Sequence, residues 1–600
     1  MKLDDGILRY YSDELAWLRV MGREFARQYP MVANRLELQD GHPADPHVER
    51  LIESFAFLTG RIQHELDAEF PEITTALLGV LYPHLVQPIP PLAVARFEID
   101  ARRGKFTTGH VIPKHAALYA YGSGGVACRF RTCFETTVWP VDVTEVALDR
   151  PARFDFLNAD PRVTSVLRLR IAATAGSLAD LELDSLRLFI HPNGGPAYTL
   201  HELLFANRLG ICILPEDGET PVRLPPTALS AAGFDREDDV LPSPAHAHPG
   251  HRLIQEYLHF PEKFLFIDVS HLRRHGSKNH FDLLFLLDRV PRERLNVEAG
   301  AFVAGCTPVA NLFPRTTEPT RLDQRQLSYR LVADARRERT TEIHSIEKVS
   351  GSTNPLDETH RYEPFYSFRH AANGIGARAF WHARRVFTGR EDLPGMDTWL
   401  SFLDLDFKPA LPPSEVVFAH TLCTNRWLAT EVPPGARLQM EEVGPVTVST
   451  LGRPTPPVYP PLGGPGVWRL ISNLSLNHLS LESGGDGLRC LQEILRVYCF
   501  NDQPSLLQQI QGIRELSSRP VLVRTGADAW RGFRSGTEVA LTFDEGVYAG
   551  GGAFLFATVL RHFLGLYCAT NSFTQLVAKR VNREGDWKRW PPLAGYQSVL

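Results

Sequence analysis

The sequence predicts a multidomain α+β protein with an N-terminal helical segment, β-rich middle domains and a C-terminal α+β domain. The hydrophobic period changes from helical to alternating near residue 91, and helical segments return after residue 466. The 600 residues also exceed what one hydrophobic core usually organises. We therefore expect a helical domain at 1–90, β-rich domains at 91–332 and 333–451, a linker at 452–466 and an α+β domain at 467–600.

The first 90 residues have the pattern of helices separated by prolines. The first helix carries apolar or small residues every three or four positions and ends at Pro30: Ile7, Tyr11, Leu15, Leu18, Gly22, Phe25 and Tyr29. A second helix begins at Pro46, after the cap Asp45, and carries one apolar face: Val48, Leu51, Phe55, Leu58, Ile62 and Leu66. Residues 1–90 hold 14 acidic against 8 basic side chains, so this segment is acidic.

The seam of the first helix has the spacing of a coiled coil and therefore needs a partner. We take Ile7, Tyr11, Leu15, Leu18 and Phe25 as a candidate interface with another subunit. The alternative is that this helix packs on residues 46–70 of its own chain. The pattern alone leaves both open.

The middle of the chain reads as sheet. Four runs place apolar and polar residues in turn, as strands with one covered face do: AVARFEID (93–100), RFRTCFETTVW (129–139), VLRLRIA (166–172) and SLRLFIHP (185–192). Dense turn signals, GSGG at 122–125 and PNGGP at 192–196, separate such runs. LHELLFANRL (200–209) interrupts them with a predicted short helix, and the polar run 333–359 suggests a domain boundary.

The segment GHRLIQEYLHFPEKFLF (250–266) sets four aromatic rings around Pro261, Glu262 and Lys263. We expect the rings to fill the core of the sheet-rich domain, with Pro261 and the Glu262–Lys263 pair at a turn. Replacing Phe264 with Asp should then abolish folding.

Six prolines lie in GRPTPPVYPPLGGPG (452–466), which indicates a linker or an extended strap. WRLISNLSLNHLSLES (468–483), GLRCLQEILRVYCF (487–500) and SLLQQIQGI (505–513) then read as helices, and GTEVALTFDE (536–545) as a strand. From Gly546 to Ala578 the one formally charged residue is Arg561, but a polar run at 570–572 would be costly in lipid. We expect a buried helix there rather than a membrane span.

Composition and motifs give no reason to expect an enzyme. A net charge of -5 and a pI near 6.5 argue against a nucleic-acid partner. The eight cysteines form no C-x-x-C pair and are expected to be reduced and buried. No phosphate-binding loop or nucleophile elbow occurs, and Asp404 and Asp406 fit the solvent face of a strand. The N-terminus lacks the apolar stretch of a signal peptide, which points to the cytoplasm. We expect no catalytic residues and no cofactor.

One histidine cluster resembles a metal-binding signature. His246, His248 and His251 match three positions of the H-x-H-x-D-H pattern of metallo-β-lactamase-type hydrolases, but Gly250 stands where its aspartate belongs. The cluster also lies in a proline-rich loop without a preceding strand. A histidine-rich loop is favoured over a metal site, and a metal-dependent hydrolase remains the alternative function.

Several long segments resemble one known family. They include YYSDELAWLRVMGREFARQYP near the start, GHRLIQEYLHFPEKFLF, CTPVANLFPRTTEPTRLD, YRLVADARRERTTEIHSI, RYEPFYSFRH, LCTNR, WRLISNLSLNHLSL, FRSGTEVALTFDE and NSFTQLV. In this order, and over nearly the full length, they closely resemble the TssF family of type VI secretion baseplate subunits.

The resemblance implies a structural role. TssF-like proteins are noncatalytic wedge components of a contractile injection machine, similar to wedge proteins of phage-tail baseplates. Two copies associate with one TssG, and the wedges surround the VgrG hub. TssE and TssK complete the baseplate, which docks on the inner-membrane complex and supports tube and sheath assembly. The chain is therefore expected in the cytoplasm, at the inner-membrane face when assembled.

Overall fold

A computed structural model describes most of residues 82–594 and parts of the N-terminal region. The described N-terminal positions are 11–12, 14–19, 21, 31, 38–39, 42–43, 47, 49–61 and 79. Within 82–594 the longer gaps are 353–359, 366–379, 404–415, 463–486 and 525–532. Shorter gaps lie at 101–103, 105, 123–124, 159, 195, 217–219, 244–248, 275, 292–294, 296, 324, 391, 442–443, 501–502, 549–551, 566–567 and 569–571. The predicted helix at 468–483 and the pair Asp404 and Asp406 lie outside the described residues.

The chain divides into two compact units. One unit comprises residues 1–81 with 461–474, and the other comprises 82–460 with 475–600. In the first unit, positions 11–12, 14–19 and 49–61 are helical, as the apolar spacing predicts. A short antiparallel pair, β1 (Leu38–Gln39) and β2 (His42–Pro43), belongs to the same unit. The five predicted domain segments remain a prediction.

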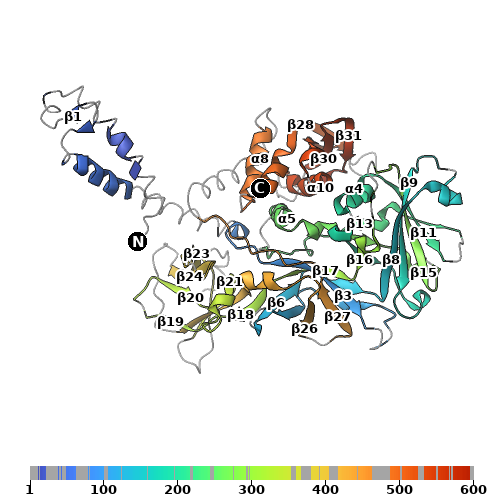
Figure 1. The fold of residues 1–600 in the computed structure, drawn as a ribbon, viewed down its shortest axis with the longest axis horizontal. Helices are drawn as coiled ribbons and strands as arrows, with labels where there is room; N and C mark the ends of the chain where they lie inside the picture. Colours follow the sequence, from blue (N-terminus) through green and yellow to red (C-terminus); the bar gives the residue numbers. More distant parts are fainter. Residues whose placement is uncertain are drawn as a thin grey trace. The chain divides into compact units, whose positions relative to one another are not determined.

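A closed six-stranded barrel forms one core of the larger unit (Figure 1). Its strands follow the order β17 (Cys306–Ala310), β3 (Leu92–Ile99), β27 (Val446–Thr450), β26 (Arg437–Met440), β5 (Ala117–Tyr121) and β6 (Ala127–Thr132). The predicted runs 93–100 and 129–139 fall on β3 and β6. Ala95, Phe97, Leu118 and Phe130 point into the barrel core because the pleat sends alternate side chains inward. The barrel therefore takes strands from both sides of residue 332.

Two antiparallel sheets are built from residues 141–304. One has the order β12 (Val222–Leu224), β11 (Arg208–Pro215), β15 (His280–Leu287), β9 (Ser165–Ala173) and β8 (Val141–Asp149). The other has the order β13 (Leu229–Ala231), β14 (Phe266–Val269), β10 (Leu186–Ile190) and β16 (Phe302–Ala304). The predicted runs 166–172 and 185–192 form β9 and β10, and the predicted short helix is α4 (Ala197–Ala206). A two-stranded pair joins β4 (His110–Ile112) to β7 (Thr136–Val138).

Two further sheets share the core that includes Tyr329, Ile343, Trp381 and Leu400. The first has the order β18 (Phe313–Thr316), β25 (Val416–Thr424), β21 (Glu342–Ser352) and β22 (His360–Tyr362), and β19 (Thr320–Arg321) also pairs with β25. The second has the order β20 (Ser328–Leu331), β24 (Met396–Leu403) and β23 (Phe380–Phe387). The polar run 333–359 therefore contains a long strand, β21, as well as turns.

The C-terminal residues form the predicted mixture of helices and sheet (Figure 1). Helices α8 (Gly487–Val497) and α9 (Pro504–Gln511) precede the sheet of β28 (Ile513–Arg524), β29 (Phe533–Phe543), β30 (Phe573–Arg580) and β31 (Arg583–Arg589), with β32 (Leu593–Ala594) beside β30. β29 and β30 are parallel, and helix α10 (Ala553–Leu564) lies between them in sequence. Such a crossover helix is what a parallel pair requires.

The apolar segment at Gly546–Ala578 is shorter as a helix than expected. Helix α10 covers Ala553–Leu564, Gly565 follows at its C-terminus, and residues from Phe573 already belong to β30. Ten of the twelve α10 residues are buried, so its apolar character reflects a protein core. Among the described residues, none of the helices has the length and apolarity needed to cross a membrane.

The eight cysteines are free thiols; seven are buried and Cys490 is half-buried, which confirms the prediction from their scattered spacing.

Candidate interaction surface and buried ionic clusters

The two N-terminal helical segments contact each other. The rings of Tyr11 and Phe57 lie 6.4 Å apart at 64°, and Arg19 Nη2 lies 3.4 Å from Glu49 Oε1. Tyr11, Leu15 and Leu18 of the candidate seam are half-buried, whereas Ile7 and Phe25 lie outside the described residues. These contacts are of the kind expected if the helix packs on residues 46–70, and the role of the seam toward another subunit remains a prediction.

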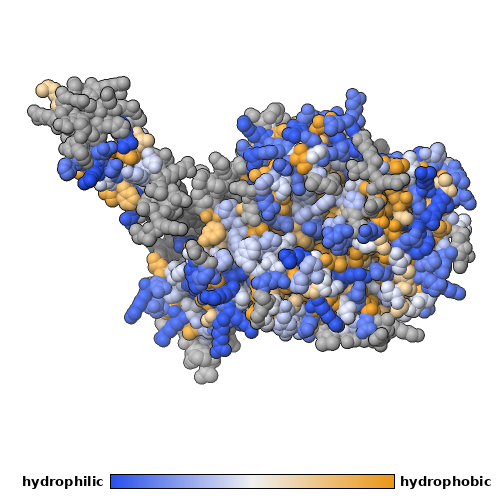
Figure 2. Space-filling model, in the orientation of Figure 1, coloured by the Kyte–Doolittle hydropathy of each residue, from blue (hydrophilic) through white to orange (hydrophobic). Residues whose placement is uncertain are grey.

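A different apolar surface of this unit is exposed. Leu51, Phe55 and Leu58, at helical spacing on residues 49–61, are 72%, 57% and 56% exposed, while Ala56 and Gly60 on the opposite side are buried. We call Leu51, Phe55 and Leu58 the apolar stripe. Figure 2 shows hydrophobic residues, in orange, on the surface of this segment. The sequence period places these residues on one face, but it does not reveal that this face is uncovered.

The structure describes only one of the three histidines of the predicted cluster. His246 and His248 lie outside the described residues, and His251 belongs to the first turn of α5 (Pro249–His259). Its Nδ1 contacts the hydroxyl of Tyr498, and its ring stacks on that of Tyr498 at 6.0 Å. A search of the described residues finds no group of three or more His, Cys, Asp or Glu side chains that could hold a metal ion. His251 packs between aromatic side chains in this arrangement.

Helix α5 carries a buried ionic cluster. Glu256 is completely buried, and its Oε1 accepts hydrogen bonds from the backbone N–H groups of Val240 (2.8 Å) and Leu241 (3.0 Å). Its Oε2 contacts the Nζ of Lys263, which is also completely buried, and lies 3.5 Å from Arg252 Nε. Burial lowers the pKa of Lys263, and the charge of Glu256 opposes that shift. A buried charge needs such partners because desolvation is costly.

The aromatic rings around Lys263 fill the core, as the sequence predicts. Phe264 has no exposed surface, and its ring lies 5.0 Å from that of Phe234 and 6.3 Å from that of Tyr257. Pro261 begins a 3-10 helix, η9 (Pro261–Leu265), so the turn is as expected. The sequence did not predict that Lys263 would point inward. It pairs there with Glu256, and this carboxylate offsets part of the cost of burying the ammonium group.

A second buried ionic cluster centres on Glu342, at the start of β21. Its Oε1 accepts from the N–H of Met396 (3.0 Å), and its Oε2 accepts from the Tyr459 hydroxyl (2.9 Å) and lies 3.3 Å from Arg426 Nη1. Burial raises the pKa of Glu342, and Arg426 acts in the opposite direction. Arg426 has φ = 54°, a left-handed conformation that is uncommon for a residue with a side chain.

Two asparagine side chains, Asn311 and Asn425, form a hydrogen-bonded pair, and Asn425 directly precedes Arg426 in the sequence. Asn311 Nδ2 donates to Asn425 Oδ1 (2.9 Å) and to the carbonyl of Arg129 (2.6 Å), while Asn425 Nδ2 donates to the carbonyl of Thr340 (3.1 Å). These bonds join the barrel strand β6 to η12 (Glu338–Thr340) and η14 (Arg426–Glu431). Three of the segments that carried the resemblance, CTPVANLFPRTTEPTRLD, YRLVADARRERTTEIHSI and LCTNR, thus meet at one polar junction.

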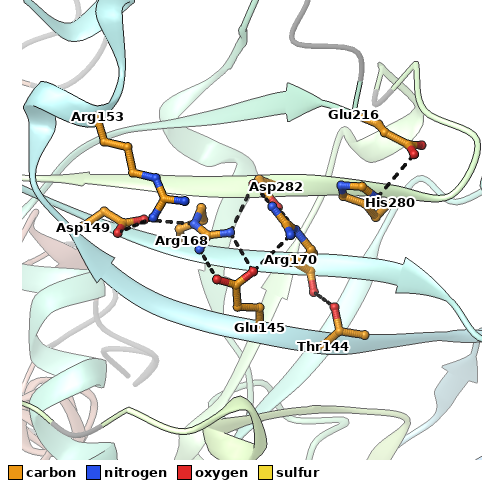
Figure 3. Close-up of polar contacts among 9 residues, drawn as sticks. All are labelled: Thr144, Glu145, Asp149, Arg153, Arg168, Arg170, Glu216, His280 and Asp282. Carbon is orange, nitrogen blue, oxygen red and sulfur yellow. Dashed lines mark hydrogen bonds and ion pairs between the residues drawn. The ribbon is translucent and has the colours of Figure 1, made fainter.

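A third cluster ties three strands of one sheet together (Figure 3). Arg168 of β9 is 2% exposed; its Nε donates to Asp149 of β8 (2.9 Å) and its Nη1 to Glu145 of β8 (3.1 Å) and Asp282 of β15 (3.4 Å). Arg170 Nε donates to Asp282 as well (2.8 Å). The hydrogen bond from Arg168 lowers the pKa of Glu145. All five charged groups are mutually paired, which suits a rigid scaffold.

Comparison with known proteins gives one consistent result. A family model described as type VI secretion system, TssF, matches residues 3–597. The type VI secretion system component TssF1 of Pseudomonas aeruginosa is 35% identical to this chain over 618 residues, covering 99% of each protein.

Two solved structures are similar as well. A chain in the structure of the type VI secretion system TssK-TssF-TssG baseplate subcomplex is 26% identical, with a TM-score of 0.71, covering 92% of this chain and 99% of that one. A chain in the baseplate complex from the type VI secretion system is 25% identical, with a TM-score of 0.56, covering 99% of this chain and 100% of that one.

Proposed function

This chain belongs to the TssF family of the type VI secretion system, and from that premise we propose that it acts as a noncatalytic structural subunit of the baseplate wedge. The observation that carries the proposal is the full-length likeness to a chain in a TssK-TssF-TssG baseplate subcomplex. Buried ionic clusters whose charges are mutually paired suit a scaffold that must keep its shape under load.

We infer the partners from the same premise. TssG is the principal partner, with two copies of this chain for each TssG, and TssK contacts the resulting wedge. TssE and the VgrG hub join in the assembled baseplate, at the cytoplasmic face of the inner membrane. The relatives in the TssK-TssF-TssG structure and in the baseplate complex support the first two partners. The remaining partners rest on family resemblance.

The apolar stripe is the surface we propose for assembly. Leu51, Phe55 and Leu58 are each more than half exposed. Burying such side chains stabilises an interface by roughly 1.5–3 kcal/mol each. The seam at Tyr11, Leu15 and Leu18 is half-buried and lies on the adjoining helix, so we propose that it borders the same interface. Helical apolar faces commonly dock against other helices in this way.

Native mass spectrometry of the chain coexpressed with TssG tests the proposal. A complex with two copies of this chain for each TssG is expected. The pair Leu51→Asp and Phe55→Asp should abolish it, because two carboxylates would be buried without partners. Arg50→Asp, on the same helix but outside the apolar stripe, is the matched control and should assemble normally.

Two outcomes would contradict the proposal at different levels. A wild-type chain that remains monomeric with TssG present contradicts the wedge function itself. A stripe variant that assembles as well as the Arg50→Asp control contradicts the interface only. Leu15→Asp with Leu18→Asp applies the same measurement to the seam.

A further inference from the structure

Two proline-rich segments of the larger unit, each next to a boundary with the other unit in sequence, run antiparallel. Residues 82–91 follow the boundary at 81, and residues 451–460 precede the boundary at 460. Ile89 and Val458 exchange two backbone hydrogen bonds, N–H to carbonyl, of 2.7 and 3.0 Å. Prolines lack the N–H that a continuous ladder would need. We call residues 451–460 the strap.

The strap forms more hydrogen bonds near its start than near its end. At its start, the N–H of Leu451 donates to the carbonyl of Val94 (2.9 Å), and Thr455 and Leu92 are joined by two bonds, one through the Thr455 hydroxyl. Toward its end, beyond the Val458 bridge, the described polar contact is the Tyr459 hydroxyl on Glu342 (2.9 Å). The described polar contacts of the outer part of the strap are therefore one backbone bridge and one side-chain hydrogen bond, and Pro457, Val458 and Pro460 are buried around them.

Glu342 has two further partners besides Tyr459. When Tyr459 leaves, the carboxylate keeps the N–H of Met396 at 3.0 Å and Arg426 Nη1 at 3.3 Å. The geometry around this ion pair is fixed by Gly395, whose φ is 141°, because a Cβ there would lie 2.1 Å from Arg426 Nη1. Tyr459 itself is half-buried, whereas Glu342 is buried. The ion pair therefore has contacts that do not involve the tyrosine.

We propose that Tyr459 is a releasable latch that holds the end of the strap against the Glu342–Arg426 ion pair. Release frees the residues leading to 461, where the chain passes into the other unit, without breaking the buried charge pair. The latch thus gives the subunit two discrete states of the strap. Such a two-state element is what a conformational switch requires.

Hydrogen exchange of the full-length chain tests the latch. Tyr459→Phe keeps the ring and removes the hydroxyl, so the fold should survive. A hydrogen bond to a charged acceptor shifts an equilibrium by about tenfold to a hundredfold. The N–H of Val458 should therefore exchange at least about tenfold faster in the variant, while that of Leu451 keeps its rate. Tyr121→Phe, which alters a hydroxyl on the exposed side of β5, is the control and should change neither rate.

Equal exchange at Val458 in Tyr459→Phe and wild type would overturn the latch. Its use in baseplate switching rests on the proposed function and has its own measurement. Cells carrying Tyr459→Phe should show more frequent spontaneous sheath contraction under the microscope, with normal assembly with TssG. Fast exchange combined with a normal contraction frequency would preserve the latch and overturn its role in firing.

Discussion

Individual buried side chains decide whether this chain folds, and Phe264 is a clear case. It has no exposed surface and lies between Phe234 and Tyr257. Phe264→Ala should lower the free energy of unfolding by about 3–5 kcal/mol, because it removes buried area and leaves a cavity. Phe264→Asp should yield no folded protein, since the ring packing is lost and the neighbouring Lys263 is already paired with Glu256. Denaturant unfolding and the soluble yield check the two variants. A folded Phe264→Asp chain that fails only to bind TssG would show an interface instead.

His201 should make the protein sensitive to acid. It is 1% exposed, its ring lies 4.7 Å from that of Phe205, and burial lowers its pKa to about 3. The unfolded chain binds a proton near pH 6.5 and the folded chain does not, so stability is full above pH 6.5 and falls as the pH decreases. Between pH 7 and 5 the loss from this residue is about 2 kcal/mol.

The comparison with His201→Leu isolates that contribution. The variant removes the ring nitrogens from an apolar site, so its free energy of unfolding should fall by about 2 kcal/mol less than that of wild type between pH 7 and 5. Urea unfolding at the two pH values measures the difference. Identical pH dependence in both proteins would show that His201 is not neutral when buried.

At the scale of elements, the local hydrophobic pattern predicted whether a segment is a helix or a strand better than it predicted what that segment packs against. The alternating runs became β3, β9 and β10, as predicted, but each strand has consecutive buried residues and is therefore covered on both faces over part of its length. The same reasoning could not show that Lys263 faces Glu256, since that pairing depends on the return of η9 onto α5. Nor could it show that the apolar stripe is exposed, because a period identifies a face and not its cover.

Helices α5 and α10 form an aromatic contact that can be tested as a unit. Tyr257 of α5 stacks on Phe556 of α10 at 5.0 Å and 12°, and both are buried. Phe556→Ala should lower the free energy of unfolding by about 3–5 kcal/mol, and Phe556→Leu by clearly less because it retains most of the buried area. Glu493→Ala, exposed on α8, is the control expected within about 0.5 kcal/mol of wild type. Denaturant unfolding that ranks the two Phe556 variants equally would contradict this packing.

At the scale of the whole molecule, the barrel shows why the pairing of distant strands could not be predicted from the sequence. β3 pairs with β17 and β27, which lie more than 200 and 340 residues away. Periodicity reports on neighbours along the chain, and no turn signal links strands so distant. The recognised segments pointed to the family over the full length, but the meeting of three of them at Asn311 and Asn425 is a property of the fold.

The division into two units makes a prediction for the complete molecule. A chain that starts at Tyr82 keeps the barrel, the sheets and the α5–α10 contact, all of which are formed by residues of the larger unit. We expect it to fold with the unfolding midpoint of the full chain, because the residues named for those cores all lie at or after Tyr82. It should also lose TssG in native mass spectrometry, since the apolar stripe is gone. If the shortened chain is folded and still binds TssG in the same ratio, the assembly surface must lie on the larger unit, and the exposed stripe would need another partner.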